Sequence, residues 1–411
     1  MREILLLSIV TFSFGIFSAN AQNMPEKIDF HRAVNMAWAV DPVRTELQVG
    51  HHSAKARSSA AGSWFAGGPT LSGEYMDDHA IGSNEGYTTY QGGVSVPLWL
   101  PGQGSATRQV ASAEAASLDE QLNVEYLSLS IRILDGAAKA QIAQERLKAA
   151  HQLYEYASRI NSLIAHSAHV GESSSSESQI AQSEMENARN EQALAQEYLE
   201  NAQAELEVLF AQPVEVDLSH GADMAHVRFV EPRDMEDNDP RVKAAHKNVE
   251  AAQANMKLAR RSFMPNPELG IDVIHEKQYG SPWDDRVGVN FSIPLPSEAR
   301  NTPIMSEASN RLASANSQEI QARRMVHLEI SRVRARLMAA TAARQTTRIA
   351  AANMQKRAAA EEHAWRVGEA TLETVMQAEQ AACNAQFANA RAEVEWHVAT
   401  LRMMIAMGIT P

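Results

Sequence analysis

The chain has 411 residues, one cysteine and a formal net charge of −13, with 21% charged and 6% aromatic residues. A single cysteine excludes an intrachain disulfide, and the acidic balance disfavours nucleic acid as a partner. The abundance of Ala, Glu, Gln and Arg favours long helices over a thick globular core, although the length alone would also suit a pair of globular domains.

Residues 1–21 are predicted to be a secretory signal peptide. Arg2 precedes an apolar run over residues 4–17, and Ala19-Asn20-Ala21 has the Ala-x-Ala pattern of a cleavage site. The run is short for a membrane helix, and no later segment approaches ~18 uninterrupted apolar residues. We therefore expect an exported chain without helical membrane spans. The mature chain would begin at Gln22, so it would have no N-terminal cysteine for a lipid anchor.

The mature chain is predicted to contain two tandem structural repeats, residues 22–210 and 238–411, with a connector at 211–237. Gly171 and Gly368, each followed by Glu, lie 197 positions apart. Pro97 and Pro294 have the same separation. Such a constant offset is typical of a duplicated chain.

Each repeat is predicted to open with a helix, at residues 28 to about 65 and at 239 to about 264. The first is interrupted at Asp41-Pro42, and the second begins at Asp239-Pro240. Both lead into segments rich in Gly and Pro that break the helical pattern.

A β-hairpin is expected next in each repeat, at about 69–99 and about 266–296, with strands at 70–76, 87–98, 268–276 and 286–295. Apolar residues alternate with small or polar residues, as in Val287, Val289, Phe291, Ile293 and Leu295. Strands of ~10 residues with this pattern suit a transmembrane barrel with a wet lumen. A soluble hairpin with one buried face has the same pattern. Aromatic residues near the strand ends suit an interfacial girdle: Tyr75, Tyr87, Tyr90, Trp99, Tyr279 and Trp283.

Long helices follow the hairpins, the first at about residues 106–169, with an apolar seam in steps of three and four that is typical of a coiled coil. Part of that seam recurs in the second repeat as Val326, Ile330, Val333, Leu337 and Ala340. A helix of ~64 residues would be ~96 Å long, so it requires a bundle surrounded by water.

Shorter return helices are expected at 173–210 and 372–407, after tips at about 168–174 and 366–372. Return helix and opening helix together match the outgoing helix in length, which predicts that they stack end to end. One short strand is expected in the connector, at 214–218.

Four strands in one chain cannot close a barrel in a membrane, where each unpaired backbone group costs several kcal/mol. Neighbouring chains must therefore supply the remaining strands. Two, three or four copies would give eight, twelve or sixteen strands, and the strand pattern does not choose among these numbers.

Several motifs carry a resemblance to a known family: Pro265-Asn266-Pro267-Glu268-Leu269, Ile293-Pro294-Leu295-Pro296 followed by Arg300-Asn301, Val367-Gly368-Glu369, and Ala406-Met407-Gly408. With the duplication, they make the chain similar, over nearly all of its mature length, to TolC-type outer-membrane factors. Within that family it resembles the CzcC-like branch that serves heavy-metal efflux.

The resemblance implies a mainly α-helical fold with a transmembrane β-barrel, assembled as a homotrimer. Twelve strands would cross the outer membrane of a Gram-negative bacterium, and an α-helical tunnel would occupy the periplasm. The helical tips would contact a periplasmic adaptor, or membrane fusion protein, whose RND-type inner-membrane pump drives transport. The implied contact residues are Val170, Gly171, Glu172, Val367, Gly368, Glu369, Thr371 and Leu372.

The first tip departs from the family pattern, because the run Ser173-Ser174-Ser175-Ser176 stands where an apolar residue such as Leu372 is usual. One of these serines is expected to cap the return helix. Acidic residues near the tips often form a cation-attracting gate in the family. The candidates here are Glu177, Glu184, Glu373 and Glu379, with solvated surface glutamates as the alternative.

Catalytic motifs are not evident. Gly102-Gln103-Gly104 lacks the third glycine of a dinucleotide-binding loop, since Thr107 occupies its position. His166 and His169 have the spacing to share one side of a helix end and hold a divalent cation transiently. No third ligand is obvious, although Glu172 is near, and a solvated helix end is the alternative. Cys383 lies among alanines and is expected to be a small packing residue.

The sequence therefore predicts a passive exit duct without catalysis or cofactor, for heavy-metal cations. A lumen lined by carboxylates would concentrate cations. One alternative is the same duct with drugs or secreted polypeptides as its cargo. A second alternative is a periplasmic coiled-coil adaptor or structural protein without a barrel, although such adaptors normally carry one helical hairpin.

Overall fold

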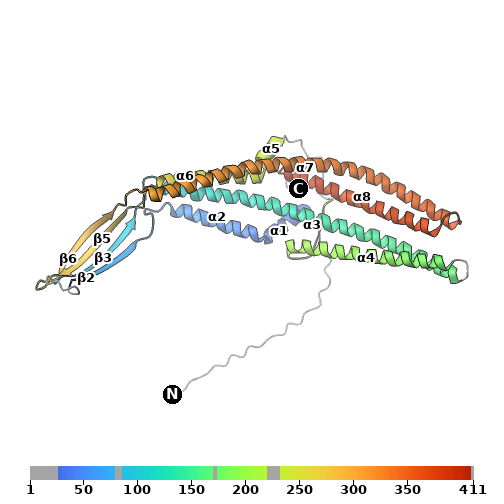
Figure 1. Ribbon diagram of the computed structural model, residues 1–411, viewed down its shortest axis with the longest axis horizontal. Helices are drawn as coiled ribbons and strands as arrows, with labels where there is room; N and C mark the ends of the chain where they lie inside the picture. Colours follow the sequence, from blue (N-terminus) through green and yellow to red (C-terminus); the bar gives the residue numbers. More distant parts are fainter. Residues whose placement is uncertain (1–25, 79–85, 170–173, 220–231, 409–411) are drawn as a thin grey trace, which may run out of the picture.

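The computed structural model describes residues 26–78, 86–169, 174–219 and 232–408. The molecule is elongated, with a β-sheet at one end and the ends of two helical hairpins at the other (Figure 1). The predicted signal peptide and residues 170–173 of the first tip lie outside the described ranges.

The sheet contains the two predicted hairpins side by side. Its strands are β2 (Thr70–Asp77), β3 (Thr88–Pro97), β5 (Glu268–Lys277) and β6 (Asp284–Ser292), in the order β2-β3-β5-β6. All neighbours are antiparallel, and the β3–β5 pair joins the two repeats. Strands β2 and β6 are thus the two edges of the sheet.

The helices have the predicted order and nearly the predicted bounds, with one exception. They are α1 (Phe30–Val40), α2 (Pro42–Ala60), α3 (Gln103–His169), α4 (Ser175–Phe210), α5 (Pro232–Asn238), α6 (Pro240–Arg261), α7 (Glu298–Arg366) and α8 (Leu372–Ala406). Helix α5 lies at the end of the connector, where no helix was expected. The outgoing helices α3 and α7 have 67 and 69 residues. No helix in the described ranges is long and apolar enough to cross a membrane.

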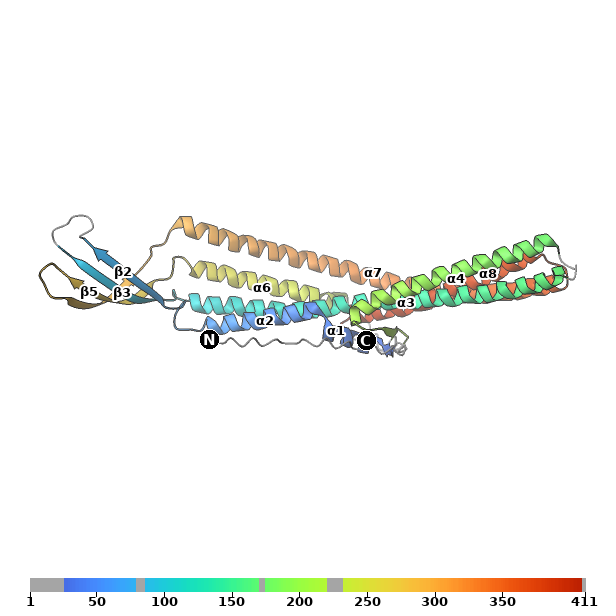
Figure 2. The ribbon, with the colours of Figure 1, turned by 90° about the horizontal axis from the view of Figure 1, so that it is seen from below.

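The helices form two tiers along the long axis, which Figure 2 shows from below. Near the sheet, α3 lies between α2 and α6, and α6 packs on α7. Toward the tips, α3 lies between α4 and α8, and α8 packs on α7. Helices α3 and α7 run through both tiers. Helix α2 packs on α3 in one tier and α4 packs on it in the other, and α6 and α8 pack on α7 in the same way. The short helices thus follow one another along each long helix, as the predicted end-to-end stacking requires.

Asp-Pro steps start the helices of the tier next to the sheet. The Asp41 carboxylate accepts a hydrogen bond from the Arg44 amide at 2.9 Å, and Asp239 accepts one from the Arg241 amide at 2.8 Å. The proline that follows each aspartate occupies the first helical turn, where no backbone donor is needed. The predicted breaks at both positions are confirmed. Both helices end a few residues before the predicted limits, at Ala60 and Arg261.

The joint between the tiers contains the largest apolar core and a strand that the sequence did not reveal. Strand β1 (Glu26–Asp29) pairs in parallel with β4 (Val214–Asp217), so the expectation that a helix begins at residue 28 is wrong. Ile28 is buried in this core, and Asp29 caps α1. A four-residue strand is too short to show period two, and its partner lies far along the chain.

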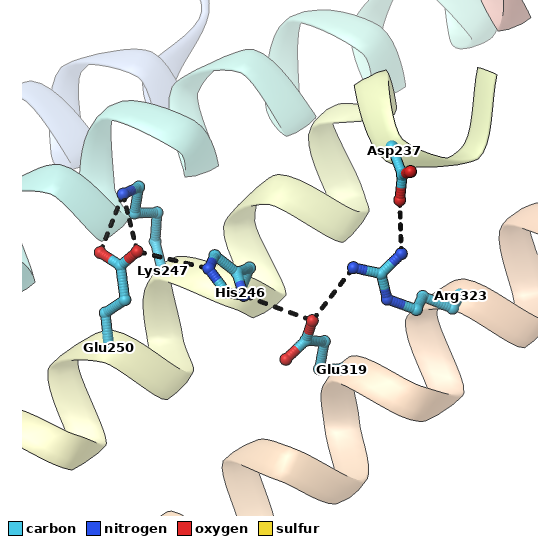
Figure 3. Close-up of polar contacts among 6 residues, drawn as sticks. All are labelled: Asp237, His246, Lys247, Glu250, Glu319 and Arg323. Atoms are coloured by element: carbon cyan, nitrogen blue, oxygen red, sulfur yellow. Dashed lines mark hydrogen bonds and ion pairs between the residues drawn. The ribbon is translucent and has the colours of Figure 1, made fainter. Parts of the chain in front are cut away.

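Helix α5 lies across α6 and α7 near this joint, held by a network of ion pairs (Figure 3). Arg323 of α7 contacts Asp237 of α5 at 2.6 Å and Glu319 at 3.2 Å. His246 of α6 lies between Glu319 and Glu250, at 3.3 and 3.4 Å. Exposed ion pairs stabilise little on their own, and Met235 supplies an apolar anchor because it is buried against α7.

Candidate functional site

One face of the four-stranded sheet is apolar. Leu71, Val94, Ile271 and Val289 stand opposite one another in a row across all four strands. On β6, Val287, Val289 and Phe291 are 71–74% exposed. A single-layer sheet that exposes a continuous apolar face requires an apolar medium or partner to cover it.

Aromatic side chains border this face at the end near the strand-connecting loops. Tyr75 and Tyr90 have ring centroids 5.0 Å apart, Tyr90 lies 6.0 Å from Trp283, and Trp283 stacks on His275 at 4.2 Å. His275 also contacts Asp285 at 2.5 Å. Amphipathic rings in such a row are typical of the level of lipid headgroups.

A second group of aromatic residues borders the face at the end near the helices. Trp64 is 91% exposed, Phe65 and Phe263 are exposed, and Trp99 donates a hydrogen bond to the Ser63 carbonyl at 3.0 Å. Ten residues of a strand tilted by about 40° cross ~25 Å of bilayer. The stretch from Asp285, at the level of the first aromatic group, to Leu295 covers that length, so the two aromatic groups suit the two borders of a hydrocarbon layer.

The opposite face of the sheet is small and polar, as the alternation predicted. Its central row is Ser72, Gly93, Asp272 and Gly288. The carboxylates on this face are Glu74, Glu268, Asp272, Glu276 and Asp284. The one basic residue there, Arg286, pairs with Glu276 at 2.5 Å and with Asp284 at 3.1 Å.

The second tip is a compact turn built on Gly368. Its φ is +80°, which favours glycine. The Gly368 amide donates to the Trp365 carbonyl at 3.0 Å, and the Glu369 amide donates to the Ala364 carbonyl at 2.8 Å, a Schellman arrangement that closes α7. Thr371 then caps α8 by accepting from the Thr374 amide at 3.3 Å. Val367 is 58% exposed, and Gly368, Glu369 and Thr371 are exposed beside it.

Leu372 does not share that exposure, because it is 3% exposed and belongs to the core between α3, α4 and α8. Val375 and Met376 lie in the same core with Ile160 and Ile164 of α3. The expectation that Leu372 offers a contact surface to a partner therefore has to be corrected: its side chain packs inside this chain. The spacing of Leu372, Val375 and Met376 is a buried-face pattern that could have indicated this.

At the first tip, the structure describes the two helix ends but not Val170, Gly171 and Glu172, which lie outside the described residues. Ser174 is the predicted serine cap of α4, and its hydroxyl accepts from the Glu177 amide at 3.2 Å. The Glu177 carboxylate accepts in return from the Ser174 amide at 3.0 Å. Glu177 thus closes a capping box, so its place as a candidate gate acid is better explained by helix capping.

The other three candidate gate acids lie in different surroundings. Glu184 lines a polar groove between α4 and α8, together with Asn187 and Gln380. Glu373 is exposed and accepts a hydrogen bond from Gln377 at 3.1 Å. Glu379 is half-buried, and burial, together with the nearby Glu362, raises its pKa.

Cys383 of α8 is buried in the apolar contact between α3 and the second hairpin. Burial raises the pKa of the Cys383 thiol to about 11, and that of the nearby Tyr156 hydroxyl to about 12. Both groups therefore stay protonated at neutral pH. The prediction that Cys383 packs in an apolar core agrees with its place in the cluster of Leu153, Tyr156 and Val375.

His166 and His169 are both exposed near the end of α3. In the described parts of the chain, no group of three or more His, Cys, Asp or Glu side chains is placed to hold a metal ion. Glu172, the further ligand that the sequence suggested, lies outside those parts.

Comparisons with known proteins agree with this arrangement. The family model described as "Outer membrane efflux protein" matches residues 47–212 and 232–408. No curated protein sequence matches the chain. Among solved structures, the fold is similar to that of the outer membrane protein VceC from Vibrio cholerae, with 17% identity over 92% of this chain and 96% of that one, and a TM-score of 0.71.

Two channels give similar values. The CmeC outer membrane channel of Campylobacter jejuni is 14% identical over 92% of this chain and 85% of its own, with a TM-score of 0.74. The MtrE outer membrane channel of Neisseria gonorrhoeae, in its open state, is 14% identical over 93% and 89%, with a TM-score of 0.72. At these identities the similarity shows the fold alone.

Proposed function

Because the chain belongs to the outer membrane efflux protein family, we propose that it is the outer-membrane channel of a tripartite efflux system. In this role it is a passive exit duct, and an inner-membrane pump supplies the energy. The observation that carries the proposal is the sheet, which has one apolar and one polar face and two unpaired edges. Such a sheet suits part of a barrel with lipid outside and water inside.

The sheet and the two helical tiers each have two edges, one formed by the first repeat and one by the second. The first-repeat edge consists of β2, α2 and α4, and the second-repeat edge consists of β6 and α7. If the second-repeat edge of one copy pairs with the first-repeat edge of the next, the contact is heterologous, and a rotation that closes arranges the copies in a ring. Ring closure also satisfies the edge backbone groups of β2 and β6 within the membrane.

Three copies are proposed, which gives a homotrimer with a twelve-stranded barrel. Both helical edges expose large apolar side chains that a neighbouring copy would cover. Those on α4 are Ile180, Leu194, Tyr198 and Val208, and those on α7 are Met325, Leu328, Met338 and Ile349. The sheet would then cross the outer membrane, and the two helical tiers would form a tunnel in the periplasm.

The second tip is the proposed contact with a periplasmic adaptor. Val367, Gly368, Glu369 and Thr371 form an exposed turn, and buried Leu372 fixes its position from below. Val170, Gly171 and Glu172 remain proposed contacts at the first tip. The adaptor would connect the tunnel to an RND-type pump of the inner membrane.

Heavy-metal cations are the proposed cargo. The support is the carboxylate-rich polar face of the sheet, because fixed negative charge around a water-filled path attracts cations. Drugs and secreted polypeptides are the competing cargoes. A deletion strain that becomes sensitive to zinc, cobalt, cadmium or copper, and not to antibiotics, would support metal cations; the reverse profile would favour drugs.

The duct itself is tested by fractionation. We expect the protein in the outer-membrane fraction as an oligomer that dissociates to the monomer only on heating. Recovery in the soluble periplasm alone would favour the rival, a coiled-coil adaptor or structural protein without a barrel.

A further inference from the structure

We propose that a belt of basic residues at the helix end of the sheet binds the phosphate groups of anionic phospholipids in the adjoining membrane leaflet. The inference rests on the proposed function, since it requires the sheet to lie in a bilayer. It goes beyond that function by naming a class of lipid and the side chains that recognise it.

The basic belt lies where four helices meet the sheet, in the last two turns of α2 and α6 and the first two turns of α3 and α7 (Figure 2). These turns hold seven basic residues and one acidic residue, Glu298, although the net charge of the chain is −13. The basic residues are all exposed: Lys55, Arg57, Arg108, Lys257, Arg260, Arg261 and Arg300. The local charge is thus opposite in sign to that of the whole chain.

The other end of the sheet carries the opposite charge. In the described part of that end, residues 77–78, 86–88 and 276–286, five acidic residues accompany two basic ones. They are Asp77, Asp78, Glu276, Asp284 and Asp285, with Lys277 and Arg286. The two ends therefore suit headgroup layers of different composition, and the helix end suits an anionic layer.

Most side chains of the basic belt have no acidic partner. Arg57 pairs with Glu114 at 2.9 Å, and Arg300 donates to the Ser262 carbonyl at 3.2 Å. Within the described ranges, no hydrogen bond or ion pair holds the other five: Lys55, Arg108, Lys257, Arg260 and Arg261. A free guanidinium presents a fork of N–H donors that matches two oxygens of a phosphate group.

Two of these arginines lie against the segments that join the helices to the strands. A Cβ atom at Gly62 would collide with the Arg108 guanidinium, and one at Gly102 would lie 3.5 Å from the guanidinium carbon of Arg261. The segment of Gly62 also carries the exposed Trp64. Arginine beside aromatic side chains is the arrangement expected at the level of lipid headgroups.

The order of surfaces along the molecule matches that of a phospholipid. The apolar face of the sheet is followed by the second aromatic group and then by the basic belt. A phospholipid has acyl chains, ester groups and a phosphate in the same order. It can therefore contact all three surfaces at once, whereas a free phosphate ion contacts the basic belt alone.

The test measures the association of spin-labelled lipids with the assembled protein in phosphatidylcholine vesicles. Labelled phosphatidylglycerol should associate about threefold more strongly than labelled phosphatidylcholine, because bases near the membrane surface attract anionic headgroups. Arg260→Gln/Arg261→Gln should remove about half of this preference or more. The matched control is Lys356→Gln/Arg357→Gln, which removes two adjacent exposed charges from the far half of α7 and should leave the preference unchanged.

Equal association of the two lipids with wild type would overturn the inference, as would an equal loss in the two double variants. Loss of the preference in added inorganic phosphate, at constant ionic strength, would also overturn it, because the residues would then bind free phosphate. Raising the potassium chloride concentration should reduce the wild-type preference, since salt screens the attraction. A preference that salt does not change would exclude the basic belt as its cause.

The same measurement separates this inference from the proposed function. Heat-modifiable oligomers show that each variant has assembled. If the protein immobilises no labelled lipid, the sheet does not lie in the bilayer and the proposed function fails. If lipid is immobilised without preference for phosphatidylglycerol, only the assignment of the basic belt fails.

Discussion

The return helices α4 and α8 leave their tips in different ways. Helix α8 is anchored by its first residue, Leu372, which is buried together with Val375 and Met376. Helix α4 begins with the capping box of Ser174 and Glu177, and its first buried residue is Ala181, almost two turns farther on. The second hairpin is thus fixed by an apolar core up to its tip, whereas the start of the first depends on polar capping.

This difference suggests a division of roles between the two repeats. The core that holds Leu372 includes Ile160 and Ile164 of α3, so the second tip is joined to the first hairpin. A firm tip presents the turn at Gly368 in one conformation. The start of α4 lacks such a joint, and we expect it to open locally at a lower free energy.

Removing the anchor should have the largest effect. Leu372→Ala deletes a buried side chain, which costs ~2–5 kcal/mol in comparable cores. Protease cleavage near residues 366–372 of the membrane-embedded protein should increase strongly. Leu163→Ala, at an exposed position of α3 near the tips, is the control, with an expected loss of ~0.5 kcal/mol or less. Equal susceptibility of the two variants would remove the contrast between the hairpins.

The turn itself should be next in sensitivity. Gly368→Val places a β-branched residue at φ +80°, at a cost of roughly 1–3 kcal/mol, although nothing lies within 4 Å of the added Cβ. The effect is therefore one of backbone conformation, and cross-linking between Val367 and the adaptor should fall.

Gly280→Val is the matched control, because Gly280 has the same φ and equally open surroundings at the opposite end of the molecule. It should leave adaptor cross-linking intact. If Gly368→Val also left it intact, the second tip would not be the docking turn.

The two caps offer a smaller contrast. Ser174→Ala removes half of a capping box and should cost ~1 kcal/mol at the start of α4. Thr371→Ala should cost less, because the neighbouring Leu372 still holds α8 in place. Hydrogen exchange of the first-turn amides measures both effects: the Glu177 amide should exchange faster in Ser174→Ala, and the Thr374 amide should change less in Thr371→Ala. The opposite ranking would show that burial does not anchor α8.

The smallest effect concerns Glu379. Burial, and then Glu362, raise its pKa above the ordinary value of 4.5, so the folded state holds this proton more tightly than the unfolded state. The stability it contributes is fully present below the ordinary value and is lost as pH rises through the raised pKa of the folded state. Glu379→Gln should therefore stabilise the protein at neutral pH, by ~0.5 kcal/mol or less because the side chain is only half-buried. Melting temperatures at several pH values should show the gain shrinking toward acid; a gain that is constant with pH would exclude this cause.

Much of the fold could be predicted from the sequence because its elements are long and periodic. The strands fall within a few residues of the predicted positions, since alternation over many residues is a strong pattern. Asp41 and Asp239 marked helix starts because an aspartate cap followed by proline has a local physical cause.

What failed depended on contacts between distant segments. Strand β1 is recognisable only through its pairing with β4. Leu372 was expected at a surface. Its spacing with Val375 and Met376 marks a buried face, but the partner of that face is the distant helix α3.

Disulfide trapping between the edges of the sheet tests the central claim most directly, namely that identical copies join β6 to β2. In a Cys383→Ala background, cysteine pairs would replace Leu71 or Gly73 on β2 and Val287 or Val289 on β6, all on the apolar face. Oxidation in the outer membrane should yield a covalent ladder that ends at three chains for at least one pair. If accessible pairs in the outer-membrane fraction yielded only monomers, the account of a duct closed by neighbouring copies would be contradicted.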